Sequence, residues 1–260
     1  TKFRHECCPS PFKTIKQKQM KALLILFVGI FLSFGAQAQA PDFDDLKILN
    51  ADYDYERLVR QCEKYMDKDD TKKNPFVYLW MTKALYGIDI SGSDNENFKN
   101  AFKDGLGYLG KCFKYDEDGE VQAEHDEFID EFSMACVERI LNDISVGDYR
   151  KAFGWNIKYK KIARNPAGMN FMDGACKYRN SDKSGANAAW KLANNELEDV
   201  TSIEDWAVAD IALLKHGVIQ TAEAMISGKQ LEKAKELMNK VAPWFEDDDD
   251  FQAQYDKIVN

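Results

Sequence analysis

The chain is poor in the residues and motifs from which most enzyme active sites are built. It has three histidines in 260 residues, and neither His125 nor His216 lies in a local motif that pairs it with a serine or cysteine nucleophile. No C-x-x-C pair is present, which argues against a redox dithiol or a cysteine-based metal site. The sequence therefore predicts a protein that is not an enzyme, with no catalytic residues and no cofactor.

Two glycine-containing segments resemble ligand-binding loops, but their context excludes that interpretation. Gly105–Gly110 reads G-x-G-x-x-G, yet it follows no strand and lies inside a helical pattern, so its glycines more plausibly allow close helix packing. Asp116–Glu120 resembles part of an EF-hand loop. Its alignment places Lys114 and His125 where calcium requires carboxylates, so we expect a turn in which Gly119 has a positive φ.

Long apolar runs are also scarce, and the one that occurs has the layout of a secretory signal. Ala22–Phe34 is a 13-residue run that follows Met20-Lys21, whereas a spanning helix needs about 20 apolar residues. The segments Ala36-Gln37-Ala38 and Ala38-Gln39-Ala40 that follow both fit the A-x-A cleavage rule. We therefore expect cleavage near Ala38 or Ala40, with an uncleaved anchor as the alternative.

This signal divides the sequence into three parts. Residues 1–19 are interpreted as an upstream extension that is not part of the native protein, 20–38 as the signal peptide, and 39–260 as the mature domain. Removing 1–38 takes away six basic residues and one acidic residue, which deepens the net charge from −9 to −14. So acidic a surface repels nucleic acid. We expect a periplasmic, extracellular or envelope-associated protein with no membrane span in the mature chain.

Four cysteines remain beyond the signal, at positions 62, 112, 136 and 176. Export makes disulfide bonds possible. Four cysteines allow three pairings, however, and the spacing selects none of them. The simpler expectation is that Cys62, Cys112, Cys136 and Cys176 are buried thiols that pack as small apolar groups.

The mature sequence has the periodicity of an all-α protein. Apolar residues recur three and four positions apart, as in Phe128–Ile140 and Leu231–Val241, while alternating strand patterns are scarce. Turn signals such as Asn74-Pro75 and Ser184-Gly185 separate the helices. Helices that open with polar residues recur at intervals of about 40 residues, which is typical of an α-solenoid of antiparallel helix pairs. They are expected to begin near Asp52, Asn97, Gly147, Gly185 and Gly228.

One segment carries a family resemblance. Gly147-Asp148-Tyr149-Arg150-Lys151-Ala152, running on to Asn165-Pro166, resembles the second helix of a tetratricopeptide repeat, although Asn156 stands where the family usually has an aromatic residue. Gly228–Ala234 and Asp54–Leu58 are similar to this second helix. A resemblance to the first helix of the repeat is carried by Tyr78, Met81, Thr82 and Leu85. The chain also looks like secreted bacterial proteins of this repeat type. The resemblance implies a tetratricopeptide-like fold.

Helical-repeat proteins usually bind partners through exposed aromatic side chains on a concave face. The candidates for such partner contacts are Trp80, Tyr149, Trp155 and Tyr159. The function that we expect is an exported, non-enzymatic scaffold or adaptor that mediates protein–protein interaction in the bacterial cell envelope. Its partner would be a protein or a peptide.

The alternative is an acidic cleft that binds a ligand or a metal, or that belongs to an enzyme of unknown reaction. Its candidate ligands are Glu124, His125 and Glu127, and on a continuous helix Glu124 and Glu127 would share a face with Glu131. The acidic run Glu246–Asp250 could also recruit Ca²⁺ or a basic partner. We interpret that run as the start of the last helix, where acids favour the helix dipole.

Overall fold

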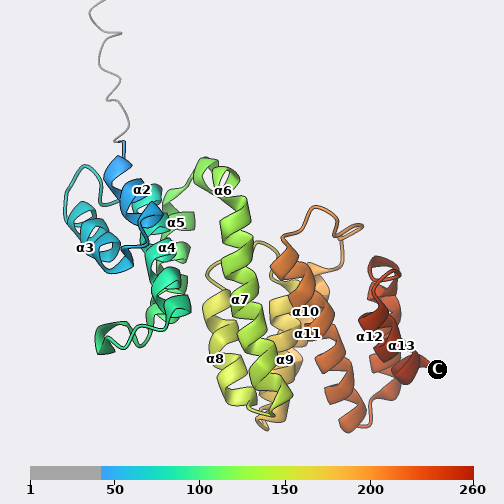
Figure 1. Cartoon of the computed structure of the whole chain (residues 1–260). Coiled ribbons are helices and arrows are strands. Elements are labelled where there is room, and N and C mark those ends of the chain that lie inside the picture. The colour runs from blue at the N-terminus through green and yellow to red at the C-terminus, as the bar shows by residue number, and fades with distance from the viewer. Residues whose placement is uncertain (1–41) are drawn as a thin grey trace, which may run out of the picture. The chain divides into compact units, whose positions relative to one another are not determined.

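The computed structural model describes residues 42–260, and these residues form helices with no strand among them (Figure 1). The prediction of an all-α protein is confirmed. The proposed upstream extension and signal peptide, residues 1–38, lie outside the described residues. The chain divides into two units, one ending at Phe43 and the other spanning Asp44–Asn260. All the helices below belong to the second unit.

The helices of this unit are mostly short. None of those in residues 42–260 is long and apolar enough to cross a bilayer. In chain order they are α2 (Asp44–Ala51), α3 (Tyr55–Met66), α4 (Pro75–Ser91), η1 (Glu96–Phe98), α5 (Ala101–Tyr115), α6 (Glu120–Glu124), α7 (Asp126–Ser145), α8 (Tyr149–Tyr159), α9 (Ala167–Arg179), α10 (Lys183–Glu196), α11 (Val208–Ser227), α12 (Leu231–Val241), η2 (Ala242–Trp244) and α13 (Asp249–Val259).

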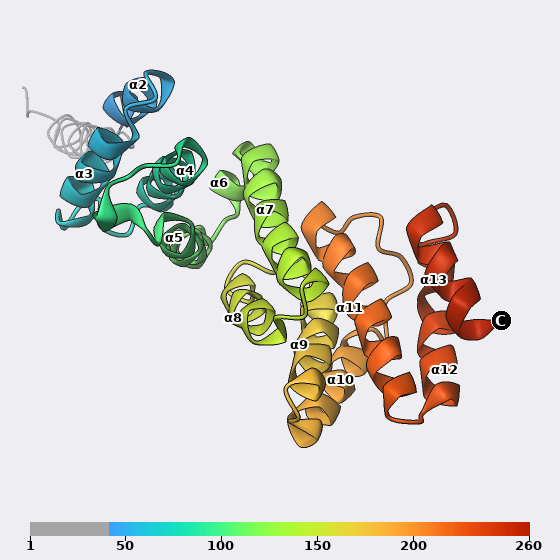
Figure 2. The same cartoon turned by 60° about the horizontal axis from the view of Figure 1, so that its bottom comes forward.

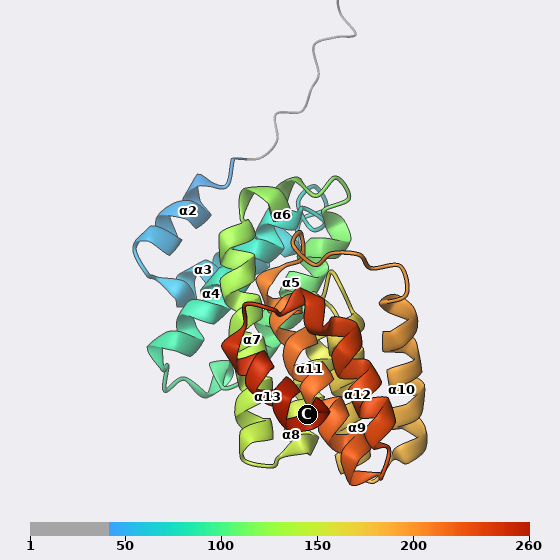
Figure 3. The same ribbon diagram turned by 90° about the vertical axis from the view of Figure 1, so that its right-hand side faces the viewer.

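Packing within this unit is mainly between helices that are neighbours in sequence. α4 packs on α3 and α5, α8 on α7 and α9, and α12 on α11 and α13. Figures 1 and 2 show the helices following one another from α2 at one end to α13 at the other. The main exception is α11, which packs against α9 and α7. Figure 3, seen from the C-terminal side, shows α12 and α13 in front of α11.

The same tight turn joins four pairs of helices. Each turn contains one residue with a left-handed backbone: Tyr53, Gly147, Ser181 or Lys229. In the turn between α7 and α8, the N–H of Gly147 donates to the Ile144 carbonyl (2.9 Å) and the N–H of Asp148 to the Asp143 carbonyl (2.8 Å). This is the Schellman arrangement, and the other three turns repeat both bonds. The unit is thus built largely of helical hairpins.

One predicted boundary was wrong because a left-handed residue need not be glycine. Ser184 and Gly185 lie inside α10, whereas the sequence placed a break there. The turn is made instead by Ser181, with φ of 71°, and the Asp182 carboxylate accepts a bond from the N–H of Gly185 (2.8 Å). Asp182 is therefore the N-cap of α10.

The core consists of two clusters of buried side chains that meet on α9 and α11. One cluster joins α4, α5, α7 and α8 to Met169, Met172 and Leu213. The other joins α10, α12 and α13 to Phe171 and Leu214. Because α9 and α11 contribute to both clusters, their mutual packing holds the two halves of the core together.

The four cysteines are all free thiols, and each is fully buried. Burial raises the pKa of every one of them, to about 12 for Cys112, Cys136 and Cys176. They fill space in the core as small apolar groups, as the simpler sequence interpretation predicted.

Candidate functional site

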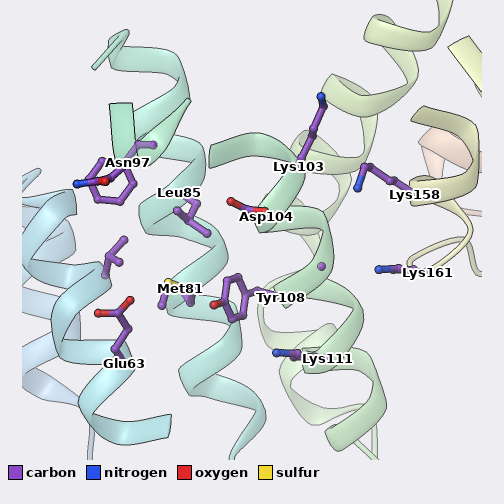
Figure 4. Close-up of a pocket in the computed structure, with 13 residues that line it drawn as sticks. Glu63, Met81, Leu85, Asn97, Lys103, Asp104, Tyr108, Lys111, Lys158 and Lys161 are labelled. Carbon is purple, nitrogen blue, oxygen red and sulfur yellow. The ribbon is translucent and has the colours of Figure 1, made fainter. Parts of the chain in front are cut away.

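A pocket of about 420 Å³ lies over the outer face of α5, where α3, α4 and α8 approach it (Figure 4). Its wall is mixed, with charged side chains around an apolar floor. The lining residues are Val59, Glu63, Met81, Leu85, Asn97, Phe98, Lys103, Asp104, Gly107, Tyr108, Lys111, Lys158 and Lys161. No single helix makes this site, because its residues come from four α-helices, from η1 and from the segment after α8.

The sequence of α5 explains why one face is buried and the other is open. Phe102, Leu106 and Leu109 recur on the buried face and are 2% exposed or less. Lys103, Gly107 and Lys111 are spaced four residues apart, so they form a stripe on the outer face. A methyl group at Gly107 would meet nothing within 4 Å. The pocket is therefore open directly above the backbone of α5.

The three glycines of the G-x-G-x-x-G segment have different roles. A Cβ at Gly105 would lie 3.1 Å from the Phe132 ring, and one at Gly110 would lie 3.0 Å from the Cβ of Lys161. These two glycines permit close packing, as predicted from the sequence. The prediction was wrong for Gly107, which borders open space.

Four lysines stand around the pocket. Lys103 and Lys111 come from α5, while Lys158 comes from α8 and Lys161 from the segment after it. None of the four forms an ion pair with a carboxylate of residues 42–260. In Figure 4 the amines of Lys158 and Lys161 reach toward α5. In a chain with a net charge of −9, this is a local excess of positive charge, because the lining has four lysines and two carboxylates.

Aromatic rings position two of these amines. The Nζ of Lys111 lies 4.9 Å from the centroid of the Tyr108 ring and 5.7 Å from that of Tyr78. The Nζ of Lys103 lies 5.3 Å from the Trp155 centroid. Such cation–π contacts hold the lysine stems against the surface and leave the ammonium protons available to an anion.

The opposite side of the pocket carries Glu63 on α3, while Asp104 lies on α5 next to Lys103. Between the two charged sides lie Val59, Met81 and Leu85, whose side chains are nearly buried. The ring of Tyr108 lies beside Met81 in Figure 4. The pocket can therefore receive an apolar group flanked by charges.

Tyr108 provides the pocket with a neutral hydroxyl. Partial burial raises the pKa of Tyr108, and the carboxylates of Glu63 and Asp104 raise it further. The phenol accordingly stays protonated at neutral pH and can donate a hydrogen bond to a bound group.

The sequence interpretation named none of these pocket residues as site residues. The available signal was weak, because Lys103 and Lys111 share a helix face while Lys158 and Lys161 are close in sequence. Nothing in the sequence places the second pair beside the first. That placement comes from the contact between α5 and α8.

The four aromatic candidates for partner contacts have different environments. Tyr159 is 1% exposed, and its hydroxyl donates to Asp210 (2.6 Å). Trp80 is 8% exposed and packs edge-on against His125. Both are core residues that a partner cannot reach. Tyr149 is half-buried and lies under Arg179. Trp155 is half-buried and supports Lys103 at the rim of the pocket.

The three candidate metal ligands do not converge. The helix that was expected to carry them is interrupted at His125, where α6 ends at Glu124 and α7 begins at Asp126. Glu124 and Glu127 therefore lie on different helices, so Glu124 does not share the face of α7 on which Glu127 and Glu131 lie four residues apart. No group of three or more His, Cys, Asp or Glu side chains in residues 42–260 could hold a metal ion.

His125 instead belongs to a packed cluster at the junction of α6 and α7. Its ring lies 6.0 Å from that of Phe76 and 6.2 Å from that of Trp80. Burial lowers the pKa of His125, the Lys83 ammonium lowers it further, and Glu124 at 3.7 Å opposes both. The neutral ring therefore serves to pack these helices against α4.

Another hollow, of about 840 Å³, lies near the C-terminus beside the acidic run Glu246–Asp250. The carboxylate of Asp248 in this run already has partners within the chain. Its carboxylate caps α13 by accepting from the N–H of Phe251 (2.9 Å), and it pairs with Lys215 (2.7 Å). The interpretation of the acidic run as the start of the last helix is confirmed.

Comparison of the chain with protein-family models, with curated proteins and with solved structures finds no match. The function must therefore be argued from the fold and from the pocket over α5.

Proposed function

We propose that this protein is an exported, non-enzymatic adaptor that binds a partner protein in the bacterial cell envelope through the pocket over α5. The observation that carries the proposal is the pocket itself. It combines an apolar floor with four lysines that have no carboxylate partner among the described residues. Protein recognition sites typically pair a desolvated apolar centre with a charged rim.

The helical architecture supports a scaffold role. In this proposal the hairpins form an α-solenoid that resembles tetratricopeptide repeats. The left-handed residues Gly147 and Ser181 are 34 positions apart, which is the length of that repeat. Ala152 is fully buried, as the resemblance requires of the small residue where the paired helices cross. Asn156, where the family usually has an aromatic residue, is also buried and donates to the Met169 carbonyl on α9 (2.9 Å).

Co-purification from cell envelopes tests this function, with one variant that closes the pocket. Gly107→Leu places a side chain in open space and replaces a helical glycine, so we expect it to fold at least as stably as the wild type. After mild crosslinking, the wild-type chain should retain a specific protein and Gly107→Leu should lose it. A wild-type chain that remains alone, or a Gly107→Leu chain that retains the same protein, would contradict the proposal.

Export is tested separately by the mass of the protein recovered from the envelope fraction. We expect the chain to begin at Gln39 or Pro41, after cleavage at Ala38 or Ala40. A chain that still carries residues 20–38 would indicate an uncleaved anchor instead.

A further inference from the structure

We infer that the pocket over α5 recognises an acidic peptide segment of its partner, in which one apolar residue is flanked by Asp or Glu. This inference rests on the proposed function, because it names the chemistry that the same site selects.

The first argument is charge complementarity. The ammonium groups of Lys103 and Lys111 on α5 and of Lys158 and Lys161 across from them lack carboxylate partners in residues 42–260. Like charges that stand close together repel one another, and a bound anion removes this cost. The chain as a whole is acidic, so its net charge disfavours an acidic partner on average, whereas the lysines of this pocket attract one.

The second argument is the apolar floor. Met81 is 1% exposed and Leu85 is 4% exposed, and with Val59 they form a surface between the two charged sides. A volume of about 420 Å³ is at the lower end of the range for ligand pockets and accommodates a large side chain with part of its backbone. A site for a free inorganic anion would have no need of this floor.

The third argument comes from the two carboxylates. Glu63 on α3 lies across the pocket from the lysines, and Asp104 lies beside Lys103 on α5. The two carboxylates repel a uniformly anionic chain such as a nucleic acid. Some of its phosphates would lie next to Glu63 and Asp104 while others lay next to the lysines. A peptide differs, because its N–H groups or a basic side chain can face Glu63 and Asp104 while its carboxylates face the lysines. The carboxylates thus favour a peptide and fix its orientation.

Fluorescence polarisation with a defined peptide tests the inference directly. The probe is a short labelled peptide with one phenylalanine flanked on both sides by glutamates, bound to the full chain at low salt. The matched probes replace every glutamate by glutamine, or the phenylalanine by glycine. We expect the acidic phenylalanine peptide to bind at least about tenfold more tightly than either matched probe. Its affinity should fall as salt is raised.

Variants locate the binding. The double variant Lys158→Glu with Lys161→Glu reverses two charges at the pocket, and Lys191→Glu with Lys233→Glu reverses two exposed lysines on α10 and α12. Both doubles change the net charge equally. We expect the first double variant to weaken peptide binding by about tenfold. The second should weaken it by less than about twofold, because its two exposed lysines lie outside the pocket and exposed charges contribute little individually.

Several results would overturn the inference. They are equal binding of the glutamine peptide, equal binding of the glycine peptide, equal weakening by both double variants, or tighter binding of a sulfated polysaccharide than of the peptide. If the peptide fails while envelope capture still depends on Gly107, the adaptor function stands and only the acidic chemistry is wrong. If envelope capture fails while the peptide binds as expected, the peptide-binding site stands and the proposed adaptor function is wrong.

Discussion

At the scale of single residues, a buried carboxylate ties three parts of the chain together. Asp210, at the start of α11, accepts bonds from the Tyr159 hydroxyl (2.6 Å) and from the N–H groups of Arg164 (3.0 Å) and Asn165 (2.8 Å). Burial raises the pKa of Asp210, and the three donors oppose that rise. Each donor is therefore needed to offset the cost of burying the carboxyl group.

Removing the hydroxyl of Tyr159 tests this connection. Tyr159→Phe leaves Asp210 buried with one donor fewer, so we expect the free energy of unfolding to fall by about 1–3 kcal/mol. Tyr149→Phe is the matched control, since Tyr149 is half-buried on the same helix and makes no side-chain hydrogen bond with residues 42–260. It should change stability by less than about 0.5 kcal/mol. Urea denaturation of both variants makes the comparison, and equal effects would contradict the account.

His216 gives the chain a pH-dependent stability. Burial lowers the pKa of His216, and the Lys215 ammonium lowers it further. The carboxylates of Asp248 and Asp250 raise this pKa and so oppose the shift. The unfolded chain therefore binds a proton more readily than the folded chain below about pH 6.5, and this part of the stability is lost as the pH falls. In His216→Gln, the drop in the free energy of unfolding from about pH 7 to about pH 5 should be smaller than in the wild type. An unchanged drop would show that other groups cause it.

At the scale of helices, α9 and α11 cross with their backbones very close together. A Cβ at Gly168 would lie 2.3 Å from the backbone nitrogen of Leu214, and one at Gly217 would lie 2.5 Å from the carbonyl oxygen of Gly168. Backbone atoms cannot move aside as a flexible side chain can. The two glycines therefore set the distance between the helices that join the two core clusters.

Alanine scanning of helical glycines tests this crossing. Gly217→Ala should lower the free energy of unfolding by about 1–3 kcal/mol or more, because the methyl group forces α9 and α11 apart. Gly154→Ala is the control, since a Cβ on that exposed glycine of α8 would meet nothing within 4 Å. It should raise stability by about 0.5–1 kcal/mol through better helix propensity. Thermal or urea denaturation measures both, and a neutral Gly217→Ala would contradict the close crossing.

Helices were easier to predict from this sequence than the way in which they pack. The 3.6-residue apolar period and the turn at Gly147 gave the helical class and the start of α8, because both depend on local physics. The interruption at His125 was missed, since neither glycine nor proline marks it. So was the left-handed turn at Ser181. The pairing of α9 with α11 depends on Gly168 and Gly217, which in sequence look like ordinary weak points of a helix.

The candidate site could not be predicted for a similar reason. Lysine side chains are mostly exposed in any protein, so Lys103 or Lys161 alone carries no signal. Only the contact between α5 and α8 makes the four lysines one group. The sequence pointed to aromatic residues as partner contacts and, in the alternative, to Glu124, His125 and Glu127 as ligands, rather than to lysines.

At the scale of the whole molecule, an acidic helical protein carries, among its described residues, a basic pocket with an apolar floor. The net charge of −9 disfavours an acidic partner on average, whereas the lysines of this pocket attract one. Packing between helices gives α3, α4, α5 and α8 fixed neighbours. The pocket is thus the surface on which the proposed adaptor function depends.

The most direct test of this claim is site-specific photo-crosslinking in the cell envelope. A photoreactive amino acid replaces Gly107 in the pocket or, as the control, Leu231, which is 44% exposed on α12. The account predicts a discrete protein adduct from position 107 and none from position 231. The absence of any protein adduct at position 107, or the same adducts from both positions, would contradict it.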